Sequence, residues 1–282
     1  MASDGQLSAV TGFYETHPIS EHQILEKMRA DGIDLSGVTE DILQNYDQDH
    51  FGGIAANDAL ATLAAIDAGC HVLDVCCGIG GPSRYLAHNH GCRVTGIDLT
   101  QSRIEGANRL TELAGLAATV THQCGNALHM PFEDETFDVV IGQEAFCHVP
   151  DKDRLVAECA RVMKPGGRIA FTDILATDAT TDATRARLQR EMTFMELGSK
   201  DAYRDRFERE DCDVLEIQDL SAEWRDILVD RLAMYRSLKN QTVDRFGADH
   251  FAKWDSAYSF FVGLYETGEL GGGRFLARRR TT

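Results

Sequence analysis

Between residues 70 and 175, short runs rich in Val, Ile and Phe alternate with turns and helical stretches. This alternation is typical of parallel strands joined by crossover helices, and it predicts an α/β fold. The predicted strands cover residues 71–76, 92–98, 118–124, 137–143 and 168–175. A helix is expected after the first, second and fourth of these strands, because apolar residues recur there at helical spacing.

The flanking regions have a different pattern. Residues 20–46 contain two short helical stretches, so we expect residues 1–50 to form an N-terminal helical cap. Residues 51–282 are then the main domain. Within it, a strand is predicted at 213–220 and a last strand at 273–279, with lid helices at about 176–205 and 221–267 inserted before that last strand. The lid is expected to contain a helical stretch near 182–198, a solvated helix face of mixed charge at 201–213, and two helices within 221–267.

Charge and composition exclude several classes of protein. The chain has 28 basic and 45 acidic residues, a net charge of −17, which is unfavourable for binding nucleic acid. No run of 18 apolar residues and no export signal is present, so we expect a cytoplasmic protein that does not enter a membrane. The eight cysteines lack metal-finger spacing and suit reduced thiols. We expect no metal.

The most informative segment is VLDVCCGIGGPSRYLA, residues 72–87, in which a strand ends in a glycine turn that opens a helix. Glycines such as Gly78 and Gly80 let the backbone approach a ligand closely at the carboxyl end of the strand. Read as a dinucleotide fingerprint, the segment gives Gly78-x-Gly80-x-x-Ser83, with Asp98 at a suitable distance behind it. An NAD-dependent oxidoreductase is therefore one hypothesis.

Asp74 favours a different ligand. A carboxylate at the strand end, four residues before Gly78, would repel a pyrophosphate but attract an ammonium group. After the second strand, Asp98 is placed to accept ribose hydroxyls, and Leu99 to lie beside a base. After the third strand, Asn126 and Ala127 are placed to bond the edge of an adenine. Adenine, ribose and an amino-acid ammonium together describe S-adenosylmethionine.

Four motifs, in order, resemble those of the class I S-adenosylmethionine-dependent methyltransferases: DVCCGIGG, GIDLT, GNALHMPF and RVMKPGGRIAFTDI. The resemblance implies a Rossmann-like seven-stranded sheet whose last strand is antiparallel. Cys76 departs from the motif, which commonly has glycine there. A cysteine fits that position if the backbone is extended, but not if φ must be positive. Asn126 likewise stands where aspartate is more usual.

The segment 141–167, IGQEAFCHVPDKDRLVAECARVMKPGG, resembles the sarcosine and dimethylglycine N-methyltransferases and, less closely, the phosphoethanolamine N-methyltransferases. This resemblance implies that Gln143 lies against the methionine end of the cofactor. It also implies that Glu144 and His148 lie at the edge of the acceptor pocket. His148 is the candidate base, since an imidazole titrates near neutrality, and Glu144 is the candidate to orient it or to hold an ammonium. Alternatively, His148 has only a structural role.

Aromatic residues of the N-terminal region are candidates for binding a methylated ammonium through cation–π contacts, or for ordinary packing. Tyr46 is the strongest of them, because Phe51-Gly52-Gly53 beside it resembles the entry motif of the family; the others are Tyr14, His17 and Phe51.

The sequence predicts a methyltransferase that acts on a small molecule, most directly on the nitrogen of a small amine or amino acid. One alternative is O- or C-methylation of a hydrophobic metabolite, which the aromatic and methionine residues of the lid favour. A second is the NAD-dependent oxidoreductase, and a third is a cofactor-binding regulator without catalysis. We expect no nucleic-acid or membrane partner, and a homodimer is compatible with the sequence.

Overall fold

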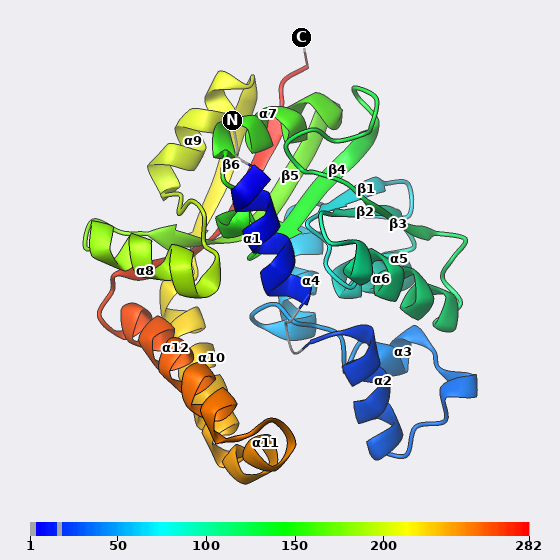
Figure 1. The fold of residues 1–282 in the computed structure, drawn as a ribbon. Coiled ribbons are helices and arrows are strands. Elements are labelled where there is room, and N and C mark those ends of the chain that lie inside the picture. Colours follow the sequence, from blue (N-terminus) through cyan, green and yellow to red (C-terminus); the bar gives the residue numbers. More distant parts are fainter. Residues whose placement is uncertain (1–3, 16–18, 282) are drawn as a thin grey trace.

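The structure, a computed structural model, describes residues 4–15 and 19–281. Seven strands form one sheet in the order β3-β2-β1-β4-β5-β7-β6 (Figure 1). Their bounds are β1 His71–Val75, β2 Arg93–Asp98, β3 Val120–Cys124, β4 Phe137–Gln143, β5 Met163–Ala176, β6 Cys212–Asp219 and β7 Leu270–Arg279.

The strands β1 to β5 run parallel to one another, and β7 runs antiparallel to both of its neighbours, β5 and β6. The pairing of β5 with β7 is long, extending from Arg168 opposite Arg278 to Ala176 opposite Leu270. The prediction of a seven-stranded α/β sheet with an antiparallel last strand is therefore confirmed. The carboxyl ends of β1, β2 and β4 meet at one edge of the sheet, where open α/β sheets bind ligands.

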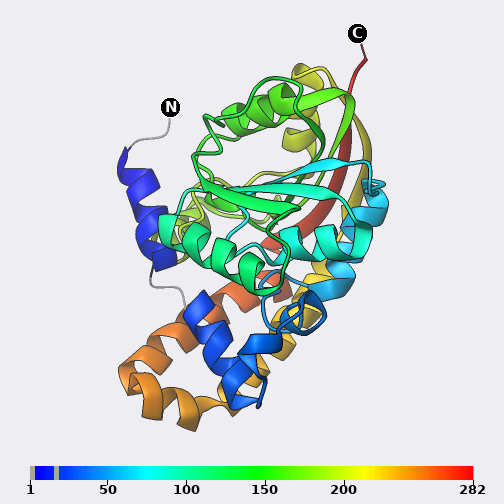
Figure 2. The same ribbon diagram turned by 90° about the vertical axis from the view of Figure 1, so that its right-hand side faces the viewer.

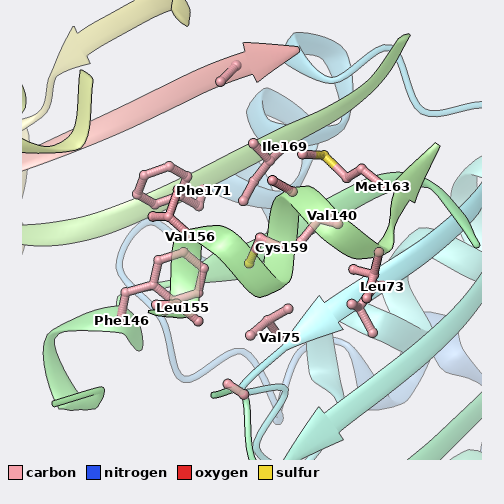
Figure 3. Close-up of a cluster of buried hydrophobic side chains, with 14 of the residues drawn as sticks. Leu73, Val75, Val140, Phe146, Leu155, Val156, Cys159, Met163, Ile169 and Phe171 are labelled. Atoms are coloured by element: carbon pink, nitrogen blue, oxygen red, sulfur yellow. The ribbon is translucent and has the colours of Figure 1, made fainter. Parts of the chain in front are cut away.

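Alternating side chains of the central strands enter two different cores, because successive residues of a strand point to opposite faces. Leu73 and Val75 of β1 pack with the buried face of α7 (Lys152–Val162) and with α9 (Lys200–Arg209). Figure 3 shows Leu155, Val156 and Cys159 of α7 lying against these strands. Val72 faces the other side, where it packs with α4 (Gly53–Leu63) and α5 (Gly81–His90).

The N-terminal region forms α1 (Asp4–Glu15), α2 (Glu21–Ala30), the short 3-10 helix η1 (Leu35–Gly37) and α3 (Glu40–Leu43). Ile24 and Met28 of α2 pack with Leu43 of α3 and with Leu110 of α6 (Gln101–Leu113). Figure 2 shows α2 and α3 lying below the sheet and α1 to one side of it. Neither α1 nor α4 was predicted as a helix.

The remaining helices are α8 (Asp182–Met192), α10 (Ser221–Ser237), α11 (Lys239–Phe246) and α12 (Ala248–Glu266), which we call the helical insert. In Figure 1, α10 to α12 extend away from the sheet. Trp224 joins α10 to β7, and a Cβ at Gly272 would come within 2.3 Å of its ring, so this contact requires glycine.

No helix formed by the described residues is both long and apolar enough to cross a bilayer.

Three predicted helical stretches end or pack differently from our expectation. The stretch predicted at 182–198 stops at Met192, because Thr193 has a left-handed backbone with φ of 55°. The mixed-charge stretch 201–213, expected to be solvated, forms most of α9 and buries Tyr203 and Phe207. Two helices were expected in the second half of the insert, but the chain also turns at Leu238 and Gly247, which gives three.

A buried ion pair lies under the short 3-10 helix η2 (Phe146–His148). Lys152 Nζ donates a hydrogen bond to the Phe146 carbonyl (2.6 Å) and lies 3.7 Å from Asp173 Oδ2. The same Asp173 oxygen accepts a hydrogen bond from Tyr203 Oη (2.6 Å), and Oδ1 accepts one from the Cys147 amide (2.9 Å). Because both charged side chains are fully buried, their desolvation must be offset by these contacts.

Replacing Lys152 by methionine should therefore leave a buried carboxylate without its cation and lower the free energy of unfolding by about 3–5 kcal/mol. The control is Lys164→Met, which removes the half-exposed pair with Asp138 and should cost about 0–1 kcal/mol. Urea denaturation measures both. Adding Asp173→Asn to the Lys152 variant should restore part of the loss, and equal effects of the two lysine substitutions would contradict this account.

Candidate active site

A cavity of about 740 Å³ opens at the carboxyl ends of β1, β2 and β4. One side, which we call the sheet wall, consists of strand ends and the loops that follow them. The opposite side, the helical wall, comes from α1 and the helical insert. The helical wall consists of Leu7, Val10, Phe13, Tyr14, Met192, Phe194, Arg231, Met234, Tyr235, Thr242, Phe246, His250, Trp254, Tyr258 and Phe261.

The glycine turn after β1 is held by the end of β2. Asp98 Oδ2 accepts a hydrogen bond from the Gly78 amide (3.0 Å), and Oδ1 accepts one from the Thr100 amide (2.8 Å). Burial raises the pKa of Asp98, although these amide hydrogen bonds oppose the shift. Each carboxylate oxygen still has a lone pair for a ligand hydroxyl. Asp98 and Gly78 both line the cavity.

Two residues of this turn differ from our expectation. Gly80 has φ of 75°, but it does not line the cavity: a Cβ there would come within 2.4 Å of His122 Nε2. The backbone of the turn and the packing against His122 both require a glycine at position 80. Cys76 does line the cavity, and it has φ of 61°. The position therefore needs the left-handed backbone that favours glycine, and Cys76 occupies it with strain.

Asp74 lies in the cavity wall at the end of β1 and is 3% exposed. Its Oδ2 accepts a hydrogen bond from Ser83 Oγ at the start of α5 (2.6 Å). Burial raises the pKa of Asp74 to about 7, and the Ser83 hydrogen bond only partly opposes this. A positively charged ligand group beside this carboxyl would favour its ionised form.

The residues predicted to lie beside an adenine also line the cavity: Leu99 directly after β2, and Asn126 and Ala127 in the loop after β3. Asn126 Oδ1 accepts a hydrogen bond from the Leu128 amide (2.9 Å), which fixes the orientation of the side-chain amide. Ala127 is buried beside Leu128 in the core under the sheet. The loop therefore presents a fixed amide and an apolar surface to the cavity.

Gln143 lies at the end of β4, also on the sheet wall. Its Nε2 donates a hydrogen bond to Asn57 Oδ1 of α4 (2.7 Å), and Asn57 in turn donates to Gln48. The other atom, Oε1, is buried without a hydrogen-bond partner among the residues that the structure describes. Such an atom suits a ligand N–H donor, so the sheet wall fits an amino-acid ammonium as well as a ribose. Sequence analysis missed Asn57, which carries no motif of its own.

Glu144 follows Gln143 and has φ of 47°. Its Oε2 accepts a hydrogen bond from the Phe51 amide (2.6 Å), and its Oε1 accepts one from Thr172 Oγ1 (2.7 Å). Burial raises the pKa of Glu144 to about 7. The carboxyl therefore ties the loop before α4 to β5, at the cavity wall.

His148 lies where the sheet wall meets the helical wall, at the end of η2. Its Nδ1 is 3.1 Å from the Thr193 carbonyl oxygen, and its Nε2 is 2.9 Å from Tyr14 Oη. A carbonyl can only accept, so Nδ1 is the protonated nitrogen and Nε2 accepts the hydrogen bond from Tyr14. The ring thus presents a basic nitrogen to a hydroxyl in the cavity.

Tyr14 was predicted only as one of several aromatic candidates, and the structure brings it to His148. Burial raises its pKa well above the usual value, while Arg103 stacks on its ring at 4.7 Å. Tyr46, the stronger candidate, is not in the cavity. Its Oη donates to Asp31 (3.1 Å), and its ring packs in the N-terminal core. His17 lies outside the described residues.

Comparison with known proteins points to methyltransferases. Residues 73–171 match the family described as a methyltransferase domain. The methyltransferase GfsG of Streptomyces halstedii is 34% identical over 57% of this chain and 59% of that protein. The glycine/sarcosine/dimethylglycine N-methyltransferase of Actinopolyspora halophila is 30% identical over 73% of this chain and 37% of that protein. The chain thus spans less than two thirds of the length of either relative.

Other relatives methylate other atoms. The tocopherol O-methyltransferase of Arabidopsis thaliana is 47% identical over 35% of this chain and 28% of that protein. The sterol 24-C-methyltransferase of Eremothecium gossypii is 38% identical over 49% of this chain and 37% of that protein. The relatives therefore do not fix the acceptor atom.

Among solved structures, a protein assigned as a sarcosine dimethylglycine methyltransferase of Galdieria sulphuraria has a TM-score of 0.75 at 20% identity. The match covers 93% of this chain and 99% of that one. Phosphoethanolamine N-methyltransferase 2 of Haemonchus contortus, solved with S-adenosylhomocysteine, also has a TM-score of 0.75, at 19% identity over 96% of this chain and 60% of that one. The chain therefore contains a methyltransferase domain at residues 73–171 and has the fold of the class I S-adenosylmethionine-dependent methyltransferases.

Proposed function

We propose that this chain transfers a methyl group from S-adenosylmethionine to a nitrogen or oxygen of a small molecule, with His148 as the base. The hydrogen bond between His148 Nε2 and Tyr14 Oη, 2.9 Å long, carries this proposal. This contact supports the assignment of His148 Nε2 as a basic nitrogen that faces the cavity where the sheet wall meets the helical wall. The sheet wall, with Asp74, Asp98 and Gln143, has the hydrogen-bonding groups that suit the cofactor.

When bound, S-adenosylmethionine supplies a methyl group on a positively charged sulfur, which is a good leaving group. The chain aligns the acceptor with that methyl group and excludes water, a proximity effect. As the new bond to the methyl carbon forms and the carbon–sulfur bond breaks, His148 Nε2 takes the proton that the nucleophile loses. Thr193 holds the opposite side of the imidazole in the required tautomer.

A nitrogen acceptor is supported by a carboxylate near Tyr258. Asp49 lines the cavity. Burial raises the pKa of Tyr258; the nearby Arg231 guanidinium opposes this shift, and the Asp49 carboxylate adds to it. An ammonium group beside the Asp49 carboxylate would gain Coulomb attraction.

An oxygen acceptor is supported by a different observation: the group that now hydrogen-bonds to His148 Nε2 is itself a hydroxyl. An acceptor hydroxyl that replaces Tyr14 Oη would meet the base with the same geometry. Mass spectrometry of the products from a panel of paired amines and alcohols separates these two candidates.

Replacing His148 by asparagine should lower kcat by about 10²- to 10⁴-fold, the usual contribution of a general base. Affinity for S-adenosylhomocysteine, measured by calorimetry, should stay unchanged because the cofactor contacts lie on the sheet wall. His22→Asn, at a 75% exposed histidine of α2, is the control. A retained kcat would limit His148 to a structural role, and a parallel loss of affinity would mean that the site had collapsed.

Binding of S-adenosylhomocysteine should release a proton near pH 6, because Asp74 has a pKa of about 7 in the free protein and a ligand ammonium favours its ionised form. Affinity should therefore rise as pH increases to about 7 and then level off. Calorimetry in two buffers of different ionisation enthalpy measures the release.

Asp74→Asn should abolish this proton release and weaken binding, whereas Glu144→Gln should retain the release. A release that disappears only in the Glu144 variant would assign the ammonium to the other carboxyl. Tight binding of NAD, with no response to S-adenosylhomocysteine, would overturn the proposed function altogether.

A further inference from the structure

The helical wall differs sharply in chemistry from the sheet wall, and this difference bears on the acceptor. We propose that the acceptor carries a large apolar body, which binds along the helical wall while its nucleophile meets His148. This inference rests on the proposed function, which it extends from the reacting atom to the class of substrate.

A continuous series of ring contacts leads from His148 out to the cavity mouth. The ring of His148 lies 6.4 Å from Phe13, and Phe13 lies 6.5 Å from Trp254. The series continues from Trp254 to His250 (6.3 Å) and from His250 to Phe246 (5.1 Å). These residues come from α1, α11 and α12, so three helices build one aromatic surface.

A second series runs inward from the same histidine. His148 lies 5.1 Å from Phe194, which lies 5.7 Å from Phe261. Tyr258 follows at 6.4 Å from Phe261. An acceptor bound at His148 is thus bordered by rings on two sides, and aromatic surfaces gain most from burying apolar groups.

The charges on this wall do not favour a small zwitterion such as a free amino acid. Arg231 is the one arginine, lysine, aspartate or glutamate among the residues that make up the helical wall. Its guanidinium already donates to the carbonyl groups of His50 (2.8 Å) and Asp49 (3.3 Å), and it stacks on Phe51. A carboxylate among the rings would therefore have to compete for Arg231 or for Arg103, the cavity-lining arginine that stacks on Tyr14 and donates to the Ile19 carbonyl (3.1 Å). Without either partner its desolvation cost would be high.

The mouth of the cavity is itself apolar. Met234 is 59% exposed and Phe246 46% exposed, although both line the cavity. Leu238, between them in the chain, is 40% exposed. Large exposed apolar side chains grouped in this way mark a binding surface for apolar ligands. A long apolar body can thus extend from His148 as far as Phe246.

The test is a homologous series of n-alkylamines and a matched series of n-alkanols, extended one methylene at a time. Because each buried methylene contributes about 0.8 kcal/mol, the dissociation constant should fall by about fourfold per methylene until the chain reaches the mouth. Binding is measured by the fluorescence of Trp254, which lines the cavity, and methyl transfer by the formation of S-adenosylhomocysteine. In the Trp254→Phe variant, buried Trp224 supplies the background signal.

Phe246→Ser should weaken binding of the long members of each series and leave the short members unaffected. Leu215→Ser, at a 48% exposed leucine of β6, is the matched control and should change neither. Affinity that does not depend on chain length, or equal effects of the two serine variants, would overturn the inference.

The two proposals fail in different ways. If short polar amines are methylated and longer chains bring no gain in affinity, the proposed function stands and the apolar acceptor is wrong. If affinity rises with chain length but no member of either series is methylated, the apolar site stands and the proposed transfer to nitrogen or oxygen is wrong.

Discussion

The hydrogen bond between the Gly78 amide and Asp98 Oδ2 joins the ends of two neighbouring parallel strands, and the sheet wall depends on it. Parallel pairing places the carboxyl ends of β1 and β2 side by side, so the glycine turn and the carboxylate meet without any long-range search. Asp74, the loop after β3 and Gln143 then line the same edge because their strands run in the same direction. The shared direction of these strands thus brings together residues as distant in the chain as Asp74 and Gln143, which are 69 positions apart.

The junction with the helical wall depends on buried polar groups. Glu144 ties the loop before α4 to β5, and the pair of Lys152 and Asp173 holds η2, from which His148 extends. Apolar packing would stabilise such positions at a lower desolvation cost. Charged groups, however, fix the directions of backbone N–H and C=O groups, and the orientation of η2 sets where the imidazole points. The helical insert completes the cavity through Thr193, which holds the imidazole, and through the aromatic rings beyond it.

Sequence reasoning succeeded where a residue's environment follows from its own strand. The five parallel strands were placed within a few residues, apart from the early start of β5 at Met163. It did not show contacts with partners that are distant in the sequence. Gly80 carries the pattern of a ligand-binding glycine, but His122, 42 residues away, is what excludes a side chain there. Tyr46 has the neighbourhood of a site residue, yet its hydroxyl bonds Asp31. In α9, Tyr203 and Phe207 are hidden in a highly charged stretch, so its buried face was not recognised.

The sequence by itself determined the α/β sheet and the glycine turn. It also determined that Asp74, Asp98, Asn126 and Gln143 each lie at or near the carboxyl end of a strand. These features are local, because strand periodicity and turn residues act over a few positions. Only the tertiary structure decided that Tyr14 meets His148 across 134 positions, and that α1, α11 and α12 form one aromatic surface. Such contacts depend on how whole helices pack against one another, and no short-range pattern in a single sequence encodes that packing.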